Sequence, residues 1–179
     1  MTMKIETSHV GSLPRSQKVV DFIFAKEKEK AYDKLAFDET MREAVELIVK
    51  KQKDVGITIA SDGETSKISY ATYVKDRFHG FGGDSPRNAP ADLKLFPTYL
   101  EKLANDGGTP KYVRPMCIDK LESKNSNDLD KDISNLSLSI KNNGIKKGFM
   151  NSASPGVISL FLQNQYYPNR EAYLEALSF

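Results

Sequence analysis

The stretch "ITIASDGE", residues 57–64, has the pattern of a buried β-strand that ends in polar residues. The helix expected before it begins after an N-cap at Asp38 and ends at Gly56. Its apolar residues recur at helical spacing: Met41, Ala44, Val45, Ile48 and Val49. A helix followed by a buried strand is the repeating element of an α/β protein, so the rest of the chain can be placed around this pair.

The same alternation continues on both sides of this pair. Three further strands are predicted, over residues 3–8, 111–119 and 146–156, and the last of them runs into a loop. Helices are predicted over residues 16–31, near 70–78, over 90–105 with an interruption at Pro97, and over 127–144, 155–162 and 169–177. Residues 79–90, "HGFGGDSPRNAP", are rich in Gly and Pro and are predicted to be a loop.

Strands that alternate with helices favour a parallel sheet and an α/β fold. Each predicted strand ends in a polar segment that carries Gly or Pro: "SHVGSLPR", "SDGE", "VRP" and "NSASPG". Ligands bind at the carboxyl ends of parallel strands, so these four segments are the expected rim of a binding site.

The composition limits the classes of function. The chain has 179 residues, of which 39% are hydrophobic and 28% charged, which fits one domain or a piece of a larger one. The formal net charge of +2 gives no electrostatic case for nucleic acid, and no apolar run suggests a membrane span or a signal peptide. The single cysteine, Cys117, excludes an internal disulfide, so we expect a cytoplasmic protein.

Two of the polar segments carry candidate binding residues. Gly11 and Ser12 could offer backbone N–H groups and a hydroxyl to an anion, with Arg15 adding charge, or could form a plain turn that caps a helix. Asp62 and Glu64 could hold a substrate ammonium group or act as a general base. They could equally form an Asx-turn and a helix N-cap.

Four other side chains have both a structural and a functional interpretation. His9 is either a ligand or a hydrogen-bonded structural residue, and Arg114 needs an anionic partner, for which Glu64 and Asp62 are candidates. Cys117 is expected to be a small buried residue, and Phe161 either stacks on a flat ligand or packs in the core. The two histidines and the cysteine form no metal-binding motif by spacing.

The four segments together resemble the C-terminal catalytic domain of cobalamin-independent methionine synthase and its shorter, single-domain relatives. The motifs "HVGSLPR", "DGE", "VRP" and "SPG" occur in that order, and the resemblance covers essentially the whole chain. It implies a (β/α)8 TIM barrel, of which residues 1–179 would be the first four βα units in a single domain. The chain stops at "YLEALSF" in a predicted helix, where Tyr173, Leu174, Leu177 and Phe179 look ready to pack against more protein.

The family transfers a methyl group from 5-methyltetrahydrofolate, usually polyglutamylated, to the thiol of homocysteine. By resemblance, the loop of Val10, Gly11 and Ser12 would hold the amino-acid part of homocysteine, and Glu64 its ammonium group. Lys111, Tyr112 and Phe161 fall where the family contacts folate, and His9, Arg15, Asp62 and Arg114 would support the site. Methionine synthases tend to have a tryptophan where Phe161 stands, and this chain has none.

The family also binds a zinc ion that activates the thiol, through a His, two Cys and a Glu from later strands, which are beyond residue 179. We therefore expect the chain to be inactive by itself, with either a missing C-terminal half or a second copy as its partner. Two alternatives remain: a related zinc-dependent alkyl-thiol transferase or demethylase, and a non-catalytic half-barrel that dimerises.

Overall fold

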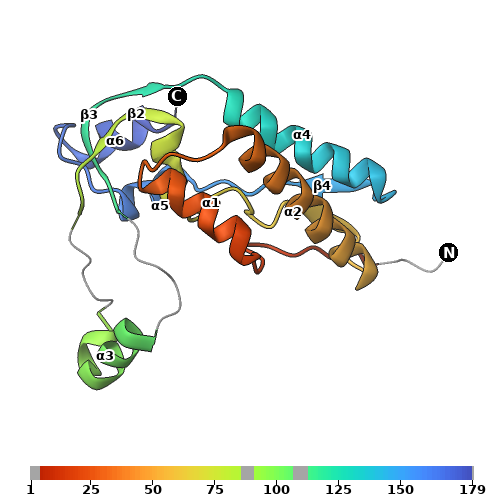
Figure 1. Cartoon of the computed structure of the whole chain (residues 1–179). Coiled ribbons are helices and arrows are strands. Elements are labelled where there is room, and N and C mark those ends of the chain that lie inside the picture. Colours follow the sequence, from red (N-terminus) through yellow and green to blue (C-terminus); the bar gives the residue numbers. More distant parts are fainter. Residues whose placement is uncertain (1–4, 86–90, 107–112, 179) are drawn as a thin grey trace.

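A computed structural model describes residues 5–85, 91–106 and 113–178 (Figure 1). The elements follow in this order: α1 (Gln17–Glu27), α2 (Lys34–Asp54), β1 (Ile59–Ser61), the 3₁₀ helix η1 (Thr72–Asp76), β2 (Phe78–Gly82), the 3₁₀ helix η2 (Leu93–Leu95), α3 (Pro97–Asp106), β3 (Met116–Ser123), α4 (Asn127–Asn142), β4 (Lys147–Phe149), α5 (Pro155–Phe161) and α6 (Arg170–Ala176). The described residues form a mixed α/β fold in which no closed barrel is present.

The parallel part of the fold is short. β1 pairs in parallel with β4, from Ile59 opposite Lys147 to Ser61 opposite Phe149. On the other side of β1, Ser8 forms an isolated parallel bridge to Ile59, so the expected first strand is reduced to one bridge in its described part. The segments after Ser8, β1 and β4 therefore leave the parallel layer at the same edge.

Helices α1, α2 and α4 lie side by side over this layer (Figure 1). The core between α2, α4 and β1 is a cluster of Val45, Val49, Ala60 and Leu136. The prediction that α2 begins after Asp38 was wrong, because the carboxylate of Asp33 accepts hydrogen bonds from the N–H groups of Leu35 and Ala36 and starts the helix at Lys34. The side chain of Asp38 instead pairs with Lys131.

The expectation of a loop over residues 79–90 was wrong for its first part. β2 and β3 form an antiparallel pair, with Phe78 opposite Ser123 and Gly82 opposite Met116. "VRP" therefore precedes an antiparallel strand and does not end a parallel one, and the fully parallel four-strand sheet is corrected to three parallel segments and a separate pair. Residues 86–90, in the rest of that expected loop, and 111–112, at the start of the expected strand, lie outside the described residues.

A second core joins this antiparallel pair to the last helices. It contains Val74, Cys117, Ile158, Leu162, Tyr173 and Leu177. The hydroxyl of Tyr173 donates a hydrogen bond to the carbonyl of Leu162 at 2.9 Å. The expectation that Tyr173 and Leu177 await further protein was therefore wrong, because residues of the antiparallel pair and of α5 already pack against them. The buried position of Cys117 is confirmed.

Two other helix predictions need correction. The helix expected near residues 70–78 is the short 3₁₀ helix η1, and Pro97 begins α3 where an interruption was predicted. Proline suits the first turn of a helix because the N–H it lacks would have no helical partner there. In α4, Leu136 is buried, whereas Leu129 and Ile133 are 45% and 47% exposed.

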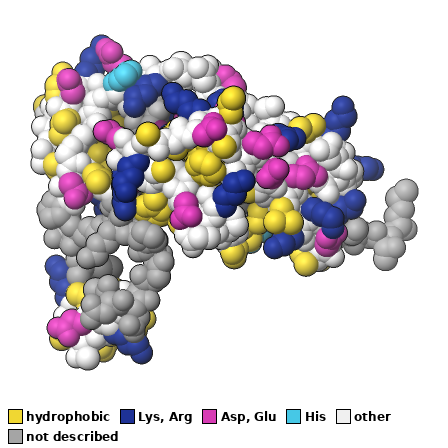
Figure 2. Space-filling view, viewed as in Figure 1, with side chains coloured by type: hydrophobic (Ala, Val, Ile, Leu, Met, Phe, Trp, Pro, Cys, Tyr) yellow, Lys and Arg dark blue, Asp and Glu magenta, His cyan; other side chains and the backbone are white. Residues whose placement is uncertain are grey.

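No helix in the part of the chain that the structure describes combines the length and apolar character that crossing a bilayer requires. On the face shown in Figure 2, basic and acidic side chains of the described residues are interspersed, and no large patch of one sign forms.

The antiparallel pair can be tested at Gly80. Gly80 has φ +91°, and a Cβ atom there would lie 2.5 Å from the carbonyl oxygen of Lys120. Gly56 has φ +86°, but a Cβ atom there meets nothing within 4 Å. In both Gly→Ala variants the positive φ should lower the free energy of unfolding by about 1–2 kcal/mol. Gly80→Ala should lower it by about 1–3 kcal/mol more through the clash. Urea denaturation measures both; equal losses would contradict the pairing of β2 with β3.

Candidate functional site

The segments that follow Ser8, β1 and β4 meet at Glu64. The hydroxyl of Ser12 donates a hydrogen bond to Glu64 Oε2, and the side-chain amide of Asn151 donates one to Glu64 Oε1. Glu64 itself is only 2% exposed, whereas Asn151 is half-buried and Ser12 exposed. Three of the four polar segments predicted to form a rim thus converge on one buried carboxylate.

The backbone of the turn at residues 62–65 aims this carboxylate. Asp62 Oδ1 accepts a hydrogen bond from the N–H of Glu64 at 3.1 Å, and the carbonyl of Asp62 accepts one from the hydroxyl of Thr65 at 2.7 Å. Glu64 has φ +54°, in the left-handed region that non-glycine residues rarely adopt. Asp62 therefore forms the Asx-turn that was one of its two interpretations, and this turn directs the side chain of Glu64 toward Ser12 and Asn151.

Arg15 supports the turn from the side of α1. Its Nη2 atom donates to the carbonyls of Glu64 and Lys67, both at 2.7 Å. Burial lowers the pKa of this guanidinium, although the charges of Glu64 and Asp62 oppose the shift. With these two bonds made to the protein's own backbone, Arg15 acts as a brace for the turn.

A buried ion pair lies behind the turn. Lys67 Nζ is 3.5 Å from Asp62 Oδ2, and the two side chains are 5% and 3% exposed. The ammonium group also lies 5.2 Å from the centre of the Tyr73 ring, in a cation–π arrangement. The hydroxyl of Tyr73 is 3.2 Å from that of Ser152, which follows Asn151. The turn after β1 is therefore connected to the segment after β4 on a second side.

The loop after Ser8 is the open side of the site. Gly11 has φ +95° and nothing within 4 Å of the position of a Cβ atom, and Val10 is 67% exposed. The N–H of Leu13 donates to the carbonyl of Gly63 at 3.0 Å, which ties the loop to the turn of Glu64. Among the described residues, His9 Nε2 is buried without a hydrogen-bond partner.

Arg114 does not pair with Glu64 or Asp62, so that expectation was wrong. It precedes β3, which belongs to the antiparallel pair, and its guanidinium carbon lies 5.8 Å from the centre of the Phe161 ring. The same ring packs against Tyr70 in a T-shaped arrangement, with ring centres 5.6 Å apart. Lys111 and Tyr112 lie outside the described residues.

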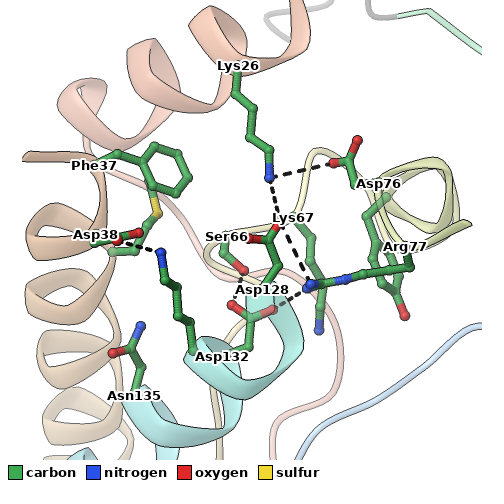
Figure 3. Close-up of a pocket in the computed structure, with 13 residues that line it drawn as sticks. Lys26, Phe37, Asp38, Ser66, Lys67, Asp76, Arg77, Asp128, Asp132 and Asn135 are labelled. Carbon is green, nitrogen blue, oxygen red and sulfur yellow. Dashed lines mark hydrogen bonds and ion pairs between the residues drawn. The ribbon is translucent and has the colours of Figure 1, made fainter. Parts of the chain in front are cut away.

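A separate pocket lies between α1, α2, η1 and α4 (Figure 3). Its acidic and basic side chains pair with one another: Arg77 with Asp132 at 2.7 Å, Lys26 with Asp128 at 3.0 Å, and Lys131 with Asp38. Its cavity of about 40 Å³ has room for a few water molecules. These ion pairs make the pocket a junction that joins the helices.

The pKa values of two carboxylates in this junction are shifted in opposite directions. Burial raises the pKa of Asp132, although the hydrogen bond from Ser66 and the charge of Arg77 oppose it. Burial also acts on Asp128, but the hydrogen bond from Lys26 and the charges of Lys26, Arg77 and Lys131 outweigh it and lower its pKa. Since Ser66 lies between Glu64 and Lys67, the bond to Asp132 anchors the site turn to α4.

The described residues do not fit the zinc ion that the resemblance implies. No group of three or more His, Cys, Asp or Glu side chains in ranges 5–85, 91–106 and 113–178 could hold a metal ion. Burial raises the pKa of the Cys117 thiol to about 11, so it does not form a thiolate readily. No step through a metal is therefore assigned to these residues.

Two residues of the site were not singled out from the sequence. Asn151 is the first residue of "NSASPG", the polar end of the segment predicted over residues 146–156, so its position at a strand end was a usable signal. Lys67 carried no such signal, because lysine is seldom buried and its partner Asp62 becomes visible only in the folded turn.

Comparison with known proteins gives a structural match only. No family model and no curated protein matches the sequence. A B12-independent methionine synthase from Shewanella sp. W3-18-1, solved in complex with selenomethionine, superposes with a TM-score of 0.64 and 17% sequence identity. The match covers 95% of this chain and 44% of that chain, so this chain spans less than half the length of the solved structure. The protein therefore has the fold of part of a B12-independent methionine synthase.

The buried ion pair can be tested by removing one charge. Lys67→Met leaves the Asp62 carboxylate buried without its partner, which should cost about 3–5 kcal/mol of unfolding free energy. The double variant Lys67→Met/Asp62→Asn should recover part of that loss, because no charge is then left unpaired. Guanidinium denaturation measures both. Lys50→Met, whose partner Asp54 is exposed, is the matched control and should change stability by less than about 1 kcal/mol.

Proposed function

We propose that this chain carries the amino-acid-binding part of a methyltransferase of the B12-independent methionine synthase type. The substrate is L-homocysteine, and the product bound at the same place is L-methionine. In this proposal the three parallel segments and their helices are the beginning of a (β/α)8 barrel, with the site at the carboxyl ends of its strands.

The observation that carries the proposal is the convergence of Ser12, Glu64 and Asn151. A carboxylate buried to 2% exposure among neutral donors retains lone pairs on both oxygens, which suits a substrate ammonium group. The loop of Val10, Gly11 and Ser12 lies beside it and offers backbone N–H groups to the substrate carboxylate. The ammonium group of an α-amino acid is thus matched by the Glu64 carboxylate, and its carboxylate by the N–H groups of the loop.

The structural neighbour supports this assignment. That methionine synthase was solved with selenomethionine, which has the same amino and carboxylate groups as methionine and homocysteine. The shared fold makes binding of the same ligand class a reasoned proposal for this chain, and the polar residues at its strand ends supply the chemistry independently.

The methyl transfer itself needs more than the described residues. In the proposed reaction, the methyl group of 5-methyltetrahydrofolate would pass to the sulfur of homocysteine, and the thiol proton would end on the folate, which leaves as tetrahydrofolate. A zinc ion held by residues other than those described would supply the activation of the thiol. The part of this chain is to bind and orient the amino acid, and Lys111, Tyr112 and Phe161 remain proposed contacts for the folate. The proposed partner is a protein segment that supplies the metal ligands.

One observation favours a second candidate, a transferase that acts on another methyl donor or thiol. Arg114 covers one part of the Phe161 ring and Tyr70 contacts it, so the ring already has two partners where a pterin would stack. Binding of 5-methyltetrahydrofolate, measured by calorimetry, separates the two candidates: the methionine synthase reaction requires it, and the second candidate does not.

Binding of L-methionine tests the proposed function directly. Glu64→Gln should weaken the affinity about tenfold or more, because a hydrogen bond to a charged group becomes a neutral one. Glu122→Gln, at an exposed position on β3, is the matched control and should bind as the unmodified chain does. Isothermal titration calorimetry measures all three. A chain that binds no L-methionine, or a Glu64→Gln variant of unchanged affinity, would overturn the proposal.

The isolated chain should form no methionine from homocysteine and 5-methyltetrahydrofolate, even with zinc added, since its described residues offer no ligand set for the metal. A coupled assay of methionine formation checks this. Turnover at an ordinary enzymatic rate, on the order of 1–1,000 per second, would show that residues of this chain activate the thiol after all.

A further inference from the structure

We propose that Asn151 is a ligand of the substrate ammonium group and makes the site selective for α-amino acids with a free primary amine. This inference rests on the proposed function and extends it to a residue for which neither the sequence motifs nor the structural match supplies a role.

The hydrogen bond to Glu64 determines how the Asn151 amide is turned. A carboxylate oxygen can only accept, so the atom of Asn151 that faces Glu64 Oε1 is the Nδ2 donor. The other end of the amide, Oδ1, is then an acceptor that takes no hydrogen bond from the described residues. The side chain is thereby oriented with a free carbonyl oxygen beside the carboxylate.

The exposure of the three side chains gives the direction from which a ligand arrives. Glu64 is buried, whereas its two partners are nearer to solvent: Asn151 is half-buried and Ser12 is exposed. An incoming ammonium group therefore meets Asn151 and Ser12 before or together with Glu64. A residue that only satisfied Glu64 from the protein interior would not lie on the ligand side.

The number of acceptors matches a primary ammonium group. Such a group has three N–H donors, and the site offers three acceptors from three segments: Glu64, Asn151 Oδ1 and the lone pairs of Ser12 Oγ. The three carry a single negative charge against the single positive charge of the ligand. A ligand without the amine would leave the Glu64 carboxylate without a cation, and an acylated amine would be both neutral and too large for three contacts.

The alternative is that Asn151 has a structural role only, by occupying Glu64 Oε1. The two roles predict different changes in ligand affinity when Asn151 is replaced. If Asn151 contacts the ammonium group, its removal weakens only ligands that have one. If it supports only the fold, its removal weakens binding of every ligand or leaves binding unchanged. If it acts only by positioning Glu64, Asn151→Ala causes no further loss of L-methionine affinity once Glu64→Gln has removed the carboxylate.

The experiment compares three ligands by calorimetry on the full chain: L-methionine, its methyl ester, which keeps the ammonium group, and 4-(methylthio)butanoate, which keeps only the carboxylate. Asn151→Ala should weaken L-methionine and the ester about tenfold each and leave the butanoate within twofold. Asn142→Ala, the same change at an exposed position on α4, should affect none of them. If the butanoate binds too weakly in the unmodified chain, the Glu64→Gln background decides the result: Asn151→Ala should still weaken L-methionine there, and an unchanged affinity would overturn the assignment.

An Asn151→Ala variant that binds L-methionine and its ester as the unmodified chain does, or that loses all three ligands equally, would overturn the assignment. Asn151→Ser, which keeps a small polar side chain but removes the amide carbonyl, replaces the alanine variant if that variant does not fold, and the same outcomes apply. If the unmodified chain binds none of the three ligands, the proposed function fails as well. If it binds L-methionine and only Glu64→Gln loses affinity, the role of Asn151 alone is wrong.

Discussion

The rest of the site depends on the turn at residues 62–65, where Asp62 holds the backbone of Glu64 in a left-handed conformation. That conformation costs about 1–3 kcal/mol and persists only where surrounding contacts over-determine it. Arg15 donates hydrogen bonds to the carbonyls of Glu64 and Lys67, and the ammonium group of Lys67 is paired with the Asp62 carboxylate. The turn is therefore rigid before any ligand arrives, which suits a group that must present a carboxylate in one direction.

The helices around the parallel layer are joined by charges as well as by apolar packing. Arg77 and Ser66 both bond to Asp132 of α4, and Lys26 of α1 reaches Asp128 of the same helix. These pairs lie in a junction next to the site turn (Figure 3), so the positions of α1 and α4 and the position of Ser66 are coupled. The bond between Ser66 and Asp132 therefore connects α4 directly to the turn that holds Glu64.

Local patterns were sufficient for helices α1, α4, α5 and α6 and for three of the four polar strand ends, and they failed for the antiparallel pair. Residues 79–83 contain three glycines, which in a sequence indicate a loop. In the folded chain Gly80 makes the pairing possible, because only a residue without Cβ can come so close to the carbonyl of Lys120. That contact joins residues 40 positions apart, and no local signal reports it. Without that pairing, the sequence predicts "VRP" at the end of a parallel strand, whereas it precedes the antiparallel strand β3.

The sequence by itself determined the α/β class, the helices that cover the layer, and the segments whose polar residues meet at the strand ends, because hydrophobic periodicity and turn chemistry are local properties. Only the tertiary structure decided that the parallel layer is confined to three segments, that Arg114 faces Phe161, and that Asn151 and Lys67 belong to the site. Those features depend on which segments become neighbours, and a hydrogen bond or a buried ion pair between distant residues exists only once the chain has brought its partners together.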